Sequence, residues 1–205
     1  MNKGIIVSIQ GYMPETTQEL AKEATNAGAV AIRTDKYIDC PMPIIGLRKI
    51  KMNDYDIMKE PYITPTINDI SIVKKWLHKN NFIAIDFRKI NKNLNEINAY
   101  CLENKIDIIA DIGDFDDYEN IIKNGYTVAY VASTLSVLYN KRFYPDIELV
   151  KKLYDAGCRN IIAEGNYRIC KDVEDVLDYG INNVCIGTAI SNIYKLTKKY
   201  TLLVR

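Results

Sequence analysis

Polar and charged residues stand directly after several short apolar runs of this 205-residue chain. Lys49 is an amine whose pKa burial can lower, and Glu164 and Asp86 are carboxylic acids that burial can keep protonated. Arg33 adds a fixed cation. If these four side chains converge, they suit the abstraction of a proton beside a carbonyl or imine group. The complete set of such residues is Gln10, Arg33, Lys49, Asp86, Asp111, Ser133, Thr134, Glu164 and Gly187. Any single one could simply terminate a strand.

Two glycine-containing segments suit a phosphate group. They are AEG at residues 163–165 and IGTA at residues 186–189, each after an apolar run. Backbone N–H groups at such turns commonly bind phosphate in barrel enzymes, so we expect Gly165, Gly187 and Thr188 at a phosphate site. The alternative is that both glycines only permit tight turns.

These residues must be positioned by the apolar runs that precede them. Eight runs rich in Ile, Val and Ala occupy residues 4–9, 29–33, 43–47, 82–86, 106–111, 127–131, 160–164 and 183–187. They are nearly continuous rather than alternating, which is typical of strands covered on both faces, as in a parallel sheet. We therefore expect eight parallel strands whose carboxyl ends carry the site.

Helix-length segments separate these runs. Helices are expected over residues 16–26, 68–79, 115–123, 147–155 and 171–178, and a glycine follows several of them. The junctions NAGA, KNGY and DAGC repeat just before an apolar run, which indicates serial βα units. The pattern predicts one (β/α)₈ TIM barrel over residues 1–205. An open doubly wound sheet is the alternative, although no G-x-G-x-x-G follows the first run.

The predicted barrel is compact, because about 200 residues is the lower limit for this architecture. Only nine residues, 34–42, separate the second and third runs. That is too few for a full crossover helix, so we expect a shortened second βα unit.

Composition excludes several classes of function. The formal net charge is +1, so no overall field attracts nucleic acid or anionic lipid. No apolar stretch approaches the length of a membrane helix and no leader pattern is seen, so a cytoplasmic location is expected. Five dispersed cysteines and the single His78 match no metal-ligand spacing and disfavour a Cys–His nucleophile.

Nine short motifs occur in a familiar order. They are IIVSIQ (5–10), AIR (31–33), PIIGLRK (43–49), YITPT (62–66), IAID (83–86), ADI (110–112), STLS (133–136), AEG (163–165) and IGTAI (186–190). In this order they resemble the N-acetylmannosamine-6-phosphate 2-epimerase family. PIIG-x-x-K and YITPT are the most specific, and the resemblance covers nearly the whole chain.

The resemblance implies a (β/α)₈ barrel that interconverts N-acetylmannosamine 6-phosphate and N-acetylglucosamine 6-phosphate in sialic acid catabolism, without metal or organic cofactor. It implies that Lys49 exchanges the proton at C2 and that Glu164 assists as acid/base. Gln10, Arg33 and Asp86 match substrate-contacting positions. The expected partner is a small sugar phosphate, with a homo-oligomer possible.

The chain departs from the family pattern near the substrate. D-A-T-x-R-x-R-P is DFRKINKN here, S-G-Y-T is SVLY at residues 136–139, and E-G-R ends in Asn166. G-G-A-I-T-R-P is reduced to residues 187–193, so two arginines are lost at the phosphate end. Arg168, or Arg88 and Lys89, are candidates to replace them.

Two alternatives to the epimerase reading stay open. The barrel could transfer a proton beside a carbonyl on a different ligand, because fold and family do not fix the substrate. It could also be a non-catalytic descendant that binds a sugar phosphate or a protein partner.

Overall fold

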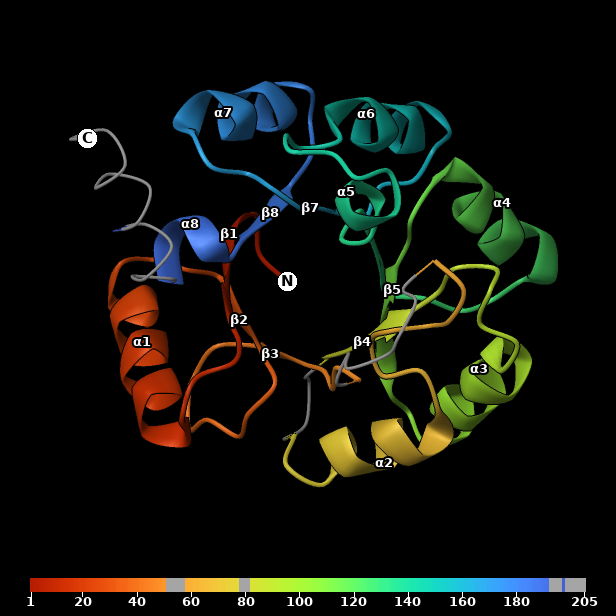
Figure 1. Ribbon diagram of the computed structural model, residues 1–205, viewed down its shortest axis with the longest axis horizontal. Helices are drawn as coiled ribbons and strands as arrows, with labels where there is room; N and C mark the ends of the chain where they lie inside the picture. The colour runs from red at the N-terminus through yellow and green to blue at the C-terminus, as the bar shows by residue number, and fades with distance from the viewer. Residues whose placement is uncertain (51–57, 78–81, 192–196, 198–205) are drawn as a thin grey trace.

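Eight parallel strands close into a barrel in sequence order. The computed structural model describes residues 1–50, 58–77, 82–191 and 197. The strands are β1 Gly4–Ile9, β2 Ala31–Thr34, β3 Ile44–Gly46, β4 Phe82–Asp86, β5 Asp107–Asp111, β6 Tyr130–Ala132, β7 Ile161–Glu164 and β8 Asn183–Ile186. Closure is made by β1 and β8, from Gly4↔Asn183 to Val7↔Ile186. Figure 1 looks down this ring, and the predicted (β/α)₈ TIM barrel is confirmed.

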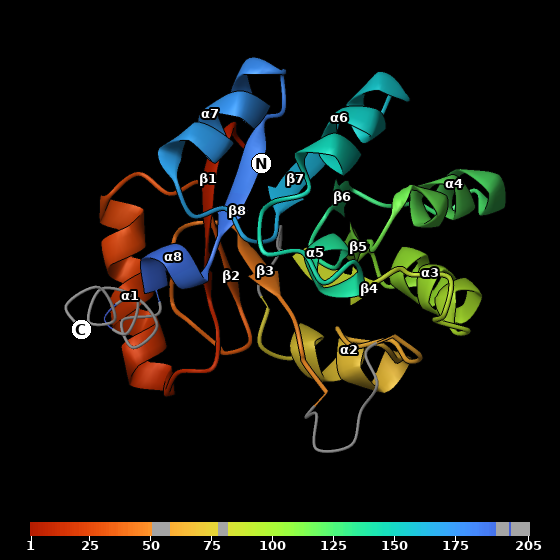
Figure 2. The same ribbon diagram turned by 45° about the horizontal axis from the view of Figure 1, so that its top comes forward.

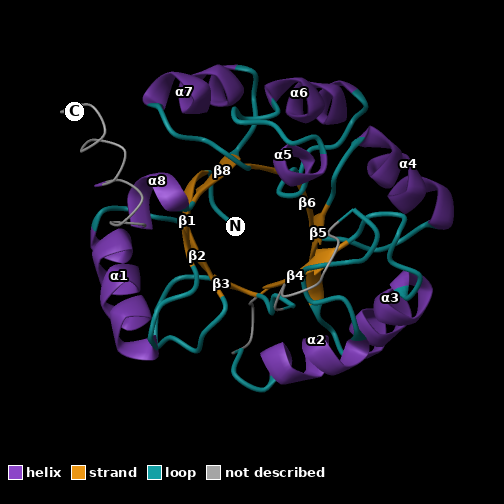
Figure 3. Ribbon diagram, viewed as in Figure 1, coloured by secondary structure: helices purple, strands orange, loops and turns teal. Residues whose placement is uncertain are grey.

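The helices form a shell outside the strands (Figures 2 and 3). They are α1 Pro14–Asn26, α2 Ile67–Lys74, α3 Leu94–Glu103, α4 Phe115–Asn124, α5 Ser136–Tyr139, α6 Ile147–Asp155, α7 Cys170–Asp178 and α8 Thr188–Ser191. Each longer helix turns an apolar stripe to the strands, as α6 does with Leu149, Val150 and Leu153. No helix in the described ranges is both long and apolar enough to cross a membrane.

The expected short second unit is confirmed. Residues 35–43 join β2 to β3 without a helix, and all of them are described. Figure 3 shows only loop at this part of the shell. Ile38 in that loop is fully buried, so a single loop side chain covers part of the surface that a helix would otherwise cover.

Several elements differ from the expected ones: most bounds shift by one or two residues, the short helices α5 and α8 were not expected, and the largest differences are in β6, α2 and α3. Strand β6 begins at Tyr130 rather than residue 127, because its ladder with β5 starts only at the pair Ile109↔Tyr130. Helix α2 ends at Lys74, before the predicted end at residue 79, which lies outside the described residues together with His78. Helix α3 was not expected, yet Leu94, Ile97 and Cys101 bury one helical face.

Alternation along the strands decides which residues face the inside of the barrel. One buried cluster contains Ile6, Ala31, Ile45, Phe82, Ala84, Ile109, Ala132, Ile162 and Cys185 and no helix residue, so it fills the interior. The intervening Ile83 and Ile85 pack with helix residues in another cluster. Residues two positions beyond the last interior residue therefore face the carboxyl-end mouth. Arg33, Asp86 and Asp111 share this parity.

Candidate active site

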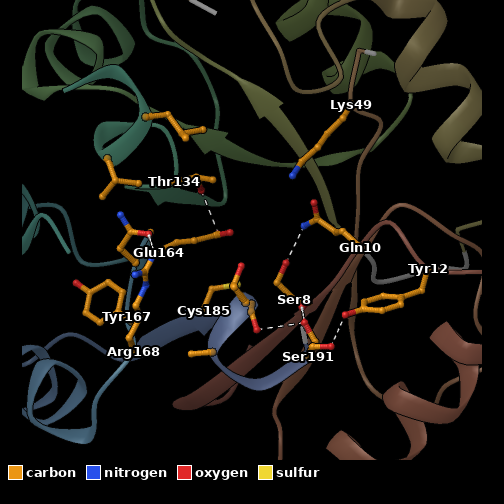
Figure 4. A pocket seen from close by; sticks show the side chains of 17 residues that line it. Ser8, Gln10, Tyr12, Lys49, Thr134, Glu164, Tyr167, Arg168, Cys185 and Ser191 are labelled. Atoms are coloured by element: carbon orange, nitrogen blue, oxygen red, sulfur yellow. Dashed lines mark hydrogen bonds between the residues drawn. The ribbon is translucent and has the colours of Figure 1, made fainter. Parts of the chain in front are cut away.

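A cavity of about 290 Å³ opens at the carboxyl ends of the strands. Figure 4 shows Lys49 reaching into it from one side and Glu164 from the other. Seven of the eleven expected site residues line it: Gln10, Lys49, Thr134, Glu164, Gly165, Gly187 and Thr188. The other four, Arg33, Asp86, Asp111 and Ser133, are at most 1% exposed and are not among the lining residues. The set therefore divides into a cavity wall and a layer behind it.

Arg33 joins two buried carboxylates at the centre of this layer. Its Nη1 and Nη2 lie 3.1 and 2.5 Å from the two Asp111 oxygens. Nη1 also lies 3.1 Å from Glu164 Oε2. The Thr134 hydroxyl lies 2.7 Å from Asp111 Oδ1 and 3.1 Å from the same Glu164 oxygen. Strands β2, β5 and β7 and the loop after β6 thus meet in one polar network.

The network sets the protonation of Glu164. Burial raises the pKa of the Glu164 carboxyl group, Arg33 opposes this, and the neighbouring Asp111 carboxylate raises the pKa further. One guanidinium group cannot fully compensate two carboxylates withdrawn from water. Glu164 therefore keeps its proton to a higher pH than an exposed glutamate does, as a group that donates and accepts protons in catalysis requires.

Lys49 lies across the cavity from Glu164 (Figure 4). Desolvation lowers the pKa of the Lys49 amine, and the positive charge of Arg33 lowers it further, against the opposing effects of Glu164, Asp111 and Asp35. A lowered pKa increases the fraction of neutral amine, which is the form that accepts a proton. The site thus contains a base and an acid whose pKa values are shifted toward each other.

Ser133 and Asp86 make protein contacts rather than facing the cavity. The Ser133 hydroxyl donates to the Glu164 carbonyl at 2.9 Å and accepts from the Glu164 N–H at 3.0 Å. Asp86 accepts from Tyr62 N at 2.6 Å and from Arg88 Nη2 at 2.6 Å. Neither side chain is among the residues that line the cavity.

The expected phosphate-binding residues line the cavity after the neighbouring strands β7 and β8. Gly165, Gly187 and Thr188 line it together with Asn166 and Arg168. Arg168 Nη2 donates to Asn166 Oδ1 at 3.1 Å, next to the position where the family pattern has an arginine. The other two candidate replacements point elsewhere, because Arg88 is bound to Asp86 and Lys89 pairs with Asp116 outside the barrel.

Several lining residues were not expected from the sequence. Ser8 accepts a hydrogen bond from Gln10 Nε2 at 2.7 Å, and Cys185 pairs in register with Glu164. Strand parity explains both positions, because Ser8 comes two residues before Gln10 and Cys185 comes two residues before Gly187, so each pair faces the same side of its strand. Tyr12, whose hydroxyl donates to the Ser191 carbonyl, and Tyr167 lie on loops, and no periodicity indicates them. The lining residues 137 and 138 are the apolar Val and Leu.

No metal site accompanies this arrangement within the described ranges. They contain no group of three or more His, Cys, Asp or Glu side chains arranged to hold a metal ion. The five cysteines are all unpaired thiols, and Cys185 beside Glu164 is held as the neutral thiol because burial raises its pKa.

Comparisons with known proteins agree with the geometry. A family model described as "Putative N-acetylmannosamine-6-phosphate epimerase" matches residues 17–205. A protein of Clostridioides difficile named as such a 2-epimerase is 31% identical, over 96% of this chain and 93% of its own. One from Caldanaerobacter subterraneus is 29% identical, over 100% and 92%.

A solved structure gives the same result for the fold. The N-acetylmannosamine-6-phosphate 2-epimerase from Clostridium perfringens superposes with a TM-score of 0.84 at 25% identity, covering 97% of this chain and 92% of that one. The family match extends over most of the chain and the barrels coincide. The chain therefore belongs to the N-acetylmannosamine-6-phosphate epimerase family, a family of carbohydrate isomerases.

Proposed function

We propose that this chain interconverts N-acetylmannosamine 6-phosphate and N-acetylglucosamine 6-phosphate by removing and returning the proton on C2. In the open-chain sugar, C2 lies next to the C1 aldehyde. Lys49 takes the C2 proton, the C–H electron pair forms a double bond between C1 and C2, and the carbonyl π pair moves to the C1 oxygen, which gives an enolate. Return of a proton to the opposite face of C2 gives the epimer. No atom or electron is gained or lost overall.

The placement of Lys49 and Glu164 carries this proposal. Both line the same cavity, one from the segment after β3 and one from the end of β7 (Figure 4). The pKa of Lys49 is lowered mainly by desolvation and that of Glu164 is raised mainly by burial. Lys49 serves as the C2 base, and Glu164 donates to or accepts from the reacting sugar as its partner.

The remaining wall residues orient the sugar. Gln10 Oε1 is buried without a hydrogen-bond partner in the described part of the chain, and Gln10 lines the cavity. A buried acceptor without a partner is costly, and a sugar hydroxyl or the acetamido N–H would satisfy it. Thr134, beside Glu164, also lines the cavity with its hydroxyl (Figure 4), while Arg33 and Asp111 contact the Glu164–Thr134 pair from behind.

The phosphate group belongs with Gly165, Gly187 and Thr188. Arg168 is the only Arg or Lys besides Lys49 among the described residues that line the cavity. A phosphate placed there would gain a charge-assisted contact from Arg168 in place of the arginines in the family pattern. The substrate is thus a small sugar phosphate of amino sugar catabolism.

Proton exchange tests the chemistry directly. The purified protein is incubated with N-acetylmannosamine 6-phosphate in D₂O, and NMR follows loss of the C2 proton and appearance of the glucosamine epimer. We expect both, and we expect Lys49→Ala to abolish them while Lys89→Ala, on the outer surface, retains them. Exchange that persists in Lys49→Ala contradicts the assignment of the base.

A second outcome points to another ligand. Val137 and Leu138 make part of the cavity wall apolar at the two positions where the family pattern S-G-Y-T has Gly and Tyr. If the native protein shows neither exchange nor product at high substrate, a different carbonyl ligand or a binding function is favoured. A thermal-shift screen of sugar phosphates then identifies it, since a ligand at a hundred times its Kd adds about 2.7 kcal/mol of stability.

A further inference from the structure

A short segment lies directly behind Lys49 and pairs with its backbone. Lys49 and Ile63 form an antiparallel bridge. Ile50 N donates to the Tyr62 carbonyl at 3.2 Å, and Thr64 N donates to the Arg48 carbonyl at 2.7 Å. The Thr64 hydroxyl also accepts from Arg48 N at 3.0 Å. Residues 60–64, which we call the support segment, therefore hold the main chain on both sides of Lys49.

The end of β4 holds the support segment in turn. Asp86 N donates to the Ile63 carbonyl at 2.8 Å, and Tyr62 N donates to Asp86 Oδ2 at 2.6 Å. Arg88 Nη2 lies 2.6 Å from Asp86 Oδ2 and donates to the Glu60 carbonyl at 3.0 Å. Asp86 and Arg88 are at most 2% exposed. The buried ion pair thus holds the backbone at Glu60 and Tyr62, and the Asp86 main chain holds it at Ile63.

The support segment contains backbone strain. Thr64 has a φ of 43°, in the left-handed region that β-branched residues rarely adopt. It is fully buried, and both its N–H and its hydroxyl are bonded to Arg48. A strained residue persists only where its surroundings determine its conformation, and such residues gather at functional sites. Here Thr64, the strained residue, holds the backbone of Arg48, the residue before Lys49, through two hydrogen bonds.

Tyr62 links the support segment to the amine itself. The Lys49 Nζ lies 5.6 Å from the centroid of the Tyr62 ring, within the range of a cation–π contact. The ring is therefore the part of Tyr62 that the structure places against the Lys49 amine. Neither Tyr62 nor Asp86 is among the residues that line the cavity.

We infer that Asp86 is a positioning residue that acts through the support segment, fixing the Lys49 backbone and placing the Tyr62 ring against the Lys49 amine. Asp86 does so without touching the substrate. This inference rests on the proposed use of Lys49 as the base. The other charged groups that act on the amine are Arg33 and Asp35 at and after the end of β2, Asp111 at the end of β5 and Glu164 at the end of β7.

Substrate binding and turnover separate this role from direct substrate contact. In a Lys49→Ala background, where no reaction occurs, calorimetry measures the Kd of N-acetylmannosamine 6-phosphate with and without Asp86→Asn. We expect a change of less than about twofold. In otherwise native enzyme we expect Asp86→Asn to lower kcat at least about tenfold, while Asp116→Asn on the surface leaves kcat unchanged. A tenfold loss of affinity, or a native kcat in Asp86→Asn, overturns the inference.

The Tyr62 ring gives an independent test if Asp86→Asn does not fold. Loss of the ring removes a contact that favours the ammonium form, so Tyr62→Leu moves the alkaline limb of the kcat/KM profile to lower pH by roughly half a unit. Tyr62→Phe keeps the ring and keeps the limb in place. An alkaline limb that is unmoved or moved upward in Tyr62→Leu overturns the inference. Failure of the proposed function itself would appear differently, as proton exchange that survives Lys49→Ala.

Discussion

Arg33 and Asp111 meet side by side, with Nη1 and Nη2 of the guanidinium group 3.1 and 2.5 Å from Oδ1 and Oδ2. Both side chains are at most 1% exposed, and Glu164 lies against the same guanidinium at 3.1 Å. Two carboxyl groups therefore share one buried cation. Such a trio has its lowest free energy when one of the two carboxyl groups is protonated. The raised pKa of Glu164 indicates that Glu164 is the group that holds this proton.

Replacement of Arg33 by Met is expected to destabilise the fold. It leaves Asp111 and Glu164 together without their cation, and breaking a buried pair by removing one partner typically costs about 3–5 kcal/mol. Urea unfolding measures this loss. Lys36→Met, which breaks an accessible pair with Asp35, is the control and should cost less than about 1 kcal/mol. In Arg33→Met/Asp111→Asn the loss should be smaller than the sum of the single losses, and strict additivity would contradict the coupling.

The pH profile of kcat/KM is expected to change shape in Glu164→Gln. In the native enzyme the active form has neutral Lys49 and protonated Glu164, so the pair together holds one proton. As pH increases, kcat/KM therefore rises through the raised pKa of Glu164 and falls through the lowered pKa of Lys49. In Glu164→Gln only neutral Lys49 is active, so activity rises once with pH, with a midpoint below 10.5. Glu119→Gln on α4 should keep the bell, and a bell in Glu164→Gln would refute the pairing.

The Thr134 hydroxyl is expected to tune Glu164. Its hydrogen bond lowers the pKa of Glu164, so Thr134→Val should move the low-pH limb of the profile upward. On the acidic side of this limb we expect kcat/KM to fall about tenfold, which corresponds to an upward shift of about one pH unit and to the loss of roughly one hydrogen bond. Thr134→Ser retains the hydroxyl and should behave as the native enzyme. Equal behaviour of the Val and Ser variants would show that the hydroxyl has no such role.

Gly165 is expected to tolerate no side chain. Its φ is +104°, and an added Cβ would lie 2.9 Å from Val137 Cγ2. Gly28 has a φ of +92° with no atom within 4 Å of an added Cβ, so Gly28→Ala reports the backbone strain alone. Chemical denaturation should show a loss of about 1–3 kcal/mol for Gly28→Ala and a larger one for Gly165→Ala. In a Val137→Ala background the excess should disappear, and its persistence would rule out the contact as the cause.

Arg168 is expected to contribute to phosphate binding. Arg168→Gln should raise KM for N-acetylmannosamine 6-phosphate about tenfold with little change in kcat, because a charge-assisted contact is lost equally from ground state and transition state. Arg159→Gln, remote from the cavity, is the control. Steady-state kinetics with unphosphorylated N-acetylmannosamine should be insensitive to Arg168→Gln. A similar loss with both sugars would place the effect elsewhere.

Strand parity explains why much of the site could be predicted from sequence. In a nearly continuous apolar strand the interior face is not marked by polarity, but it is marked by the polar residue at the end. Arg33 follows the interior Ala31, Asp111 follows Ile109 and Glu164 follows Ile162, each by two residues. Because parallel strands end at one edge of a barrel, these side chains converge without further information.

The remaining features depend on contacts that no local pattern encodes. Ser133 comes one residue after the interior Ala132, so its parity is opposite and its hydroxyl reaches the neighbouring backbone. Asp86 has the right parity, but Tyr62 and Arg88 occupy its carboxylate. Helix α3 was missed because Asn-rich sequence has weak helix propensity, and tertiary burial of Leu94, Ile97 and Cys101 outweighs it.

The register of the barrel ties its closure to its chemistry. Strands β3 and β4 share two paired positions, as do β6 and β7, and no neighbouring pair shares fewer. These two narrow seams are crossed by side chains of the site, the first by Asp86 through Tyr62 and the second by Ser133 bound to the Glu164 backbone. Local opening of either seam would carry Lys49 or Glu164 away from its partner. The two strand pairs with the fewest paired positions are therefore places where transient separation of the strands would also inactivate the enzyme.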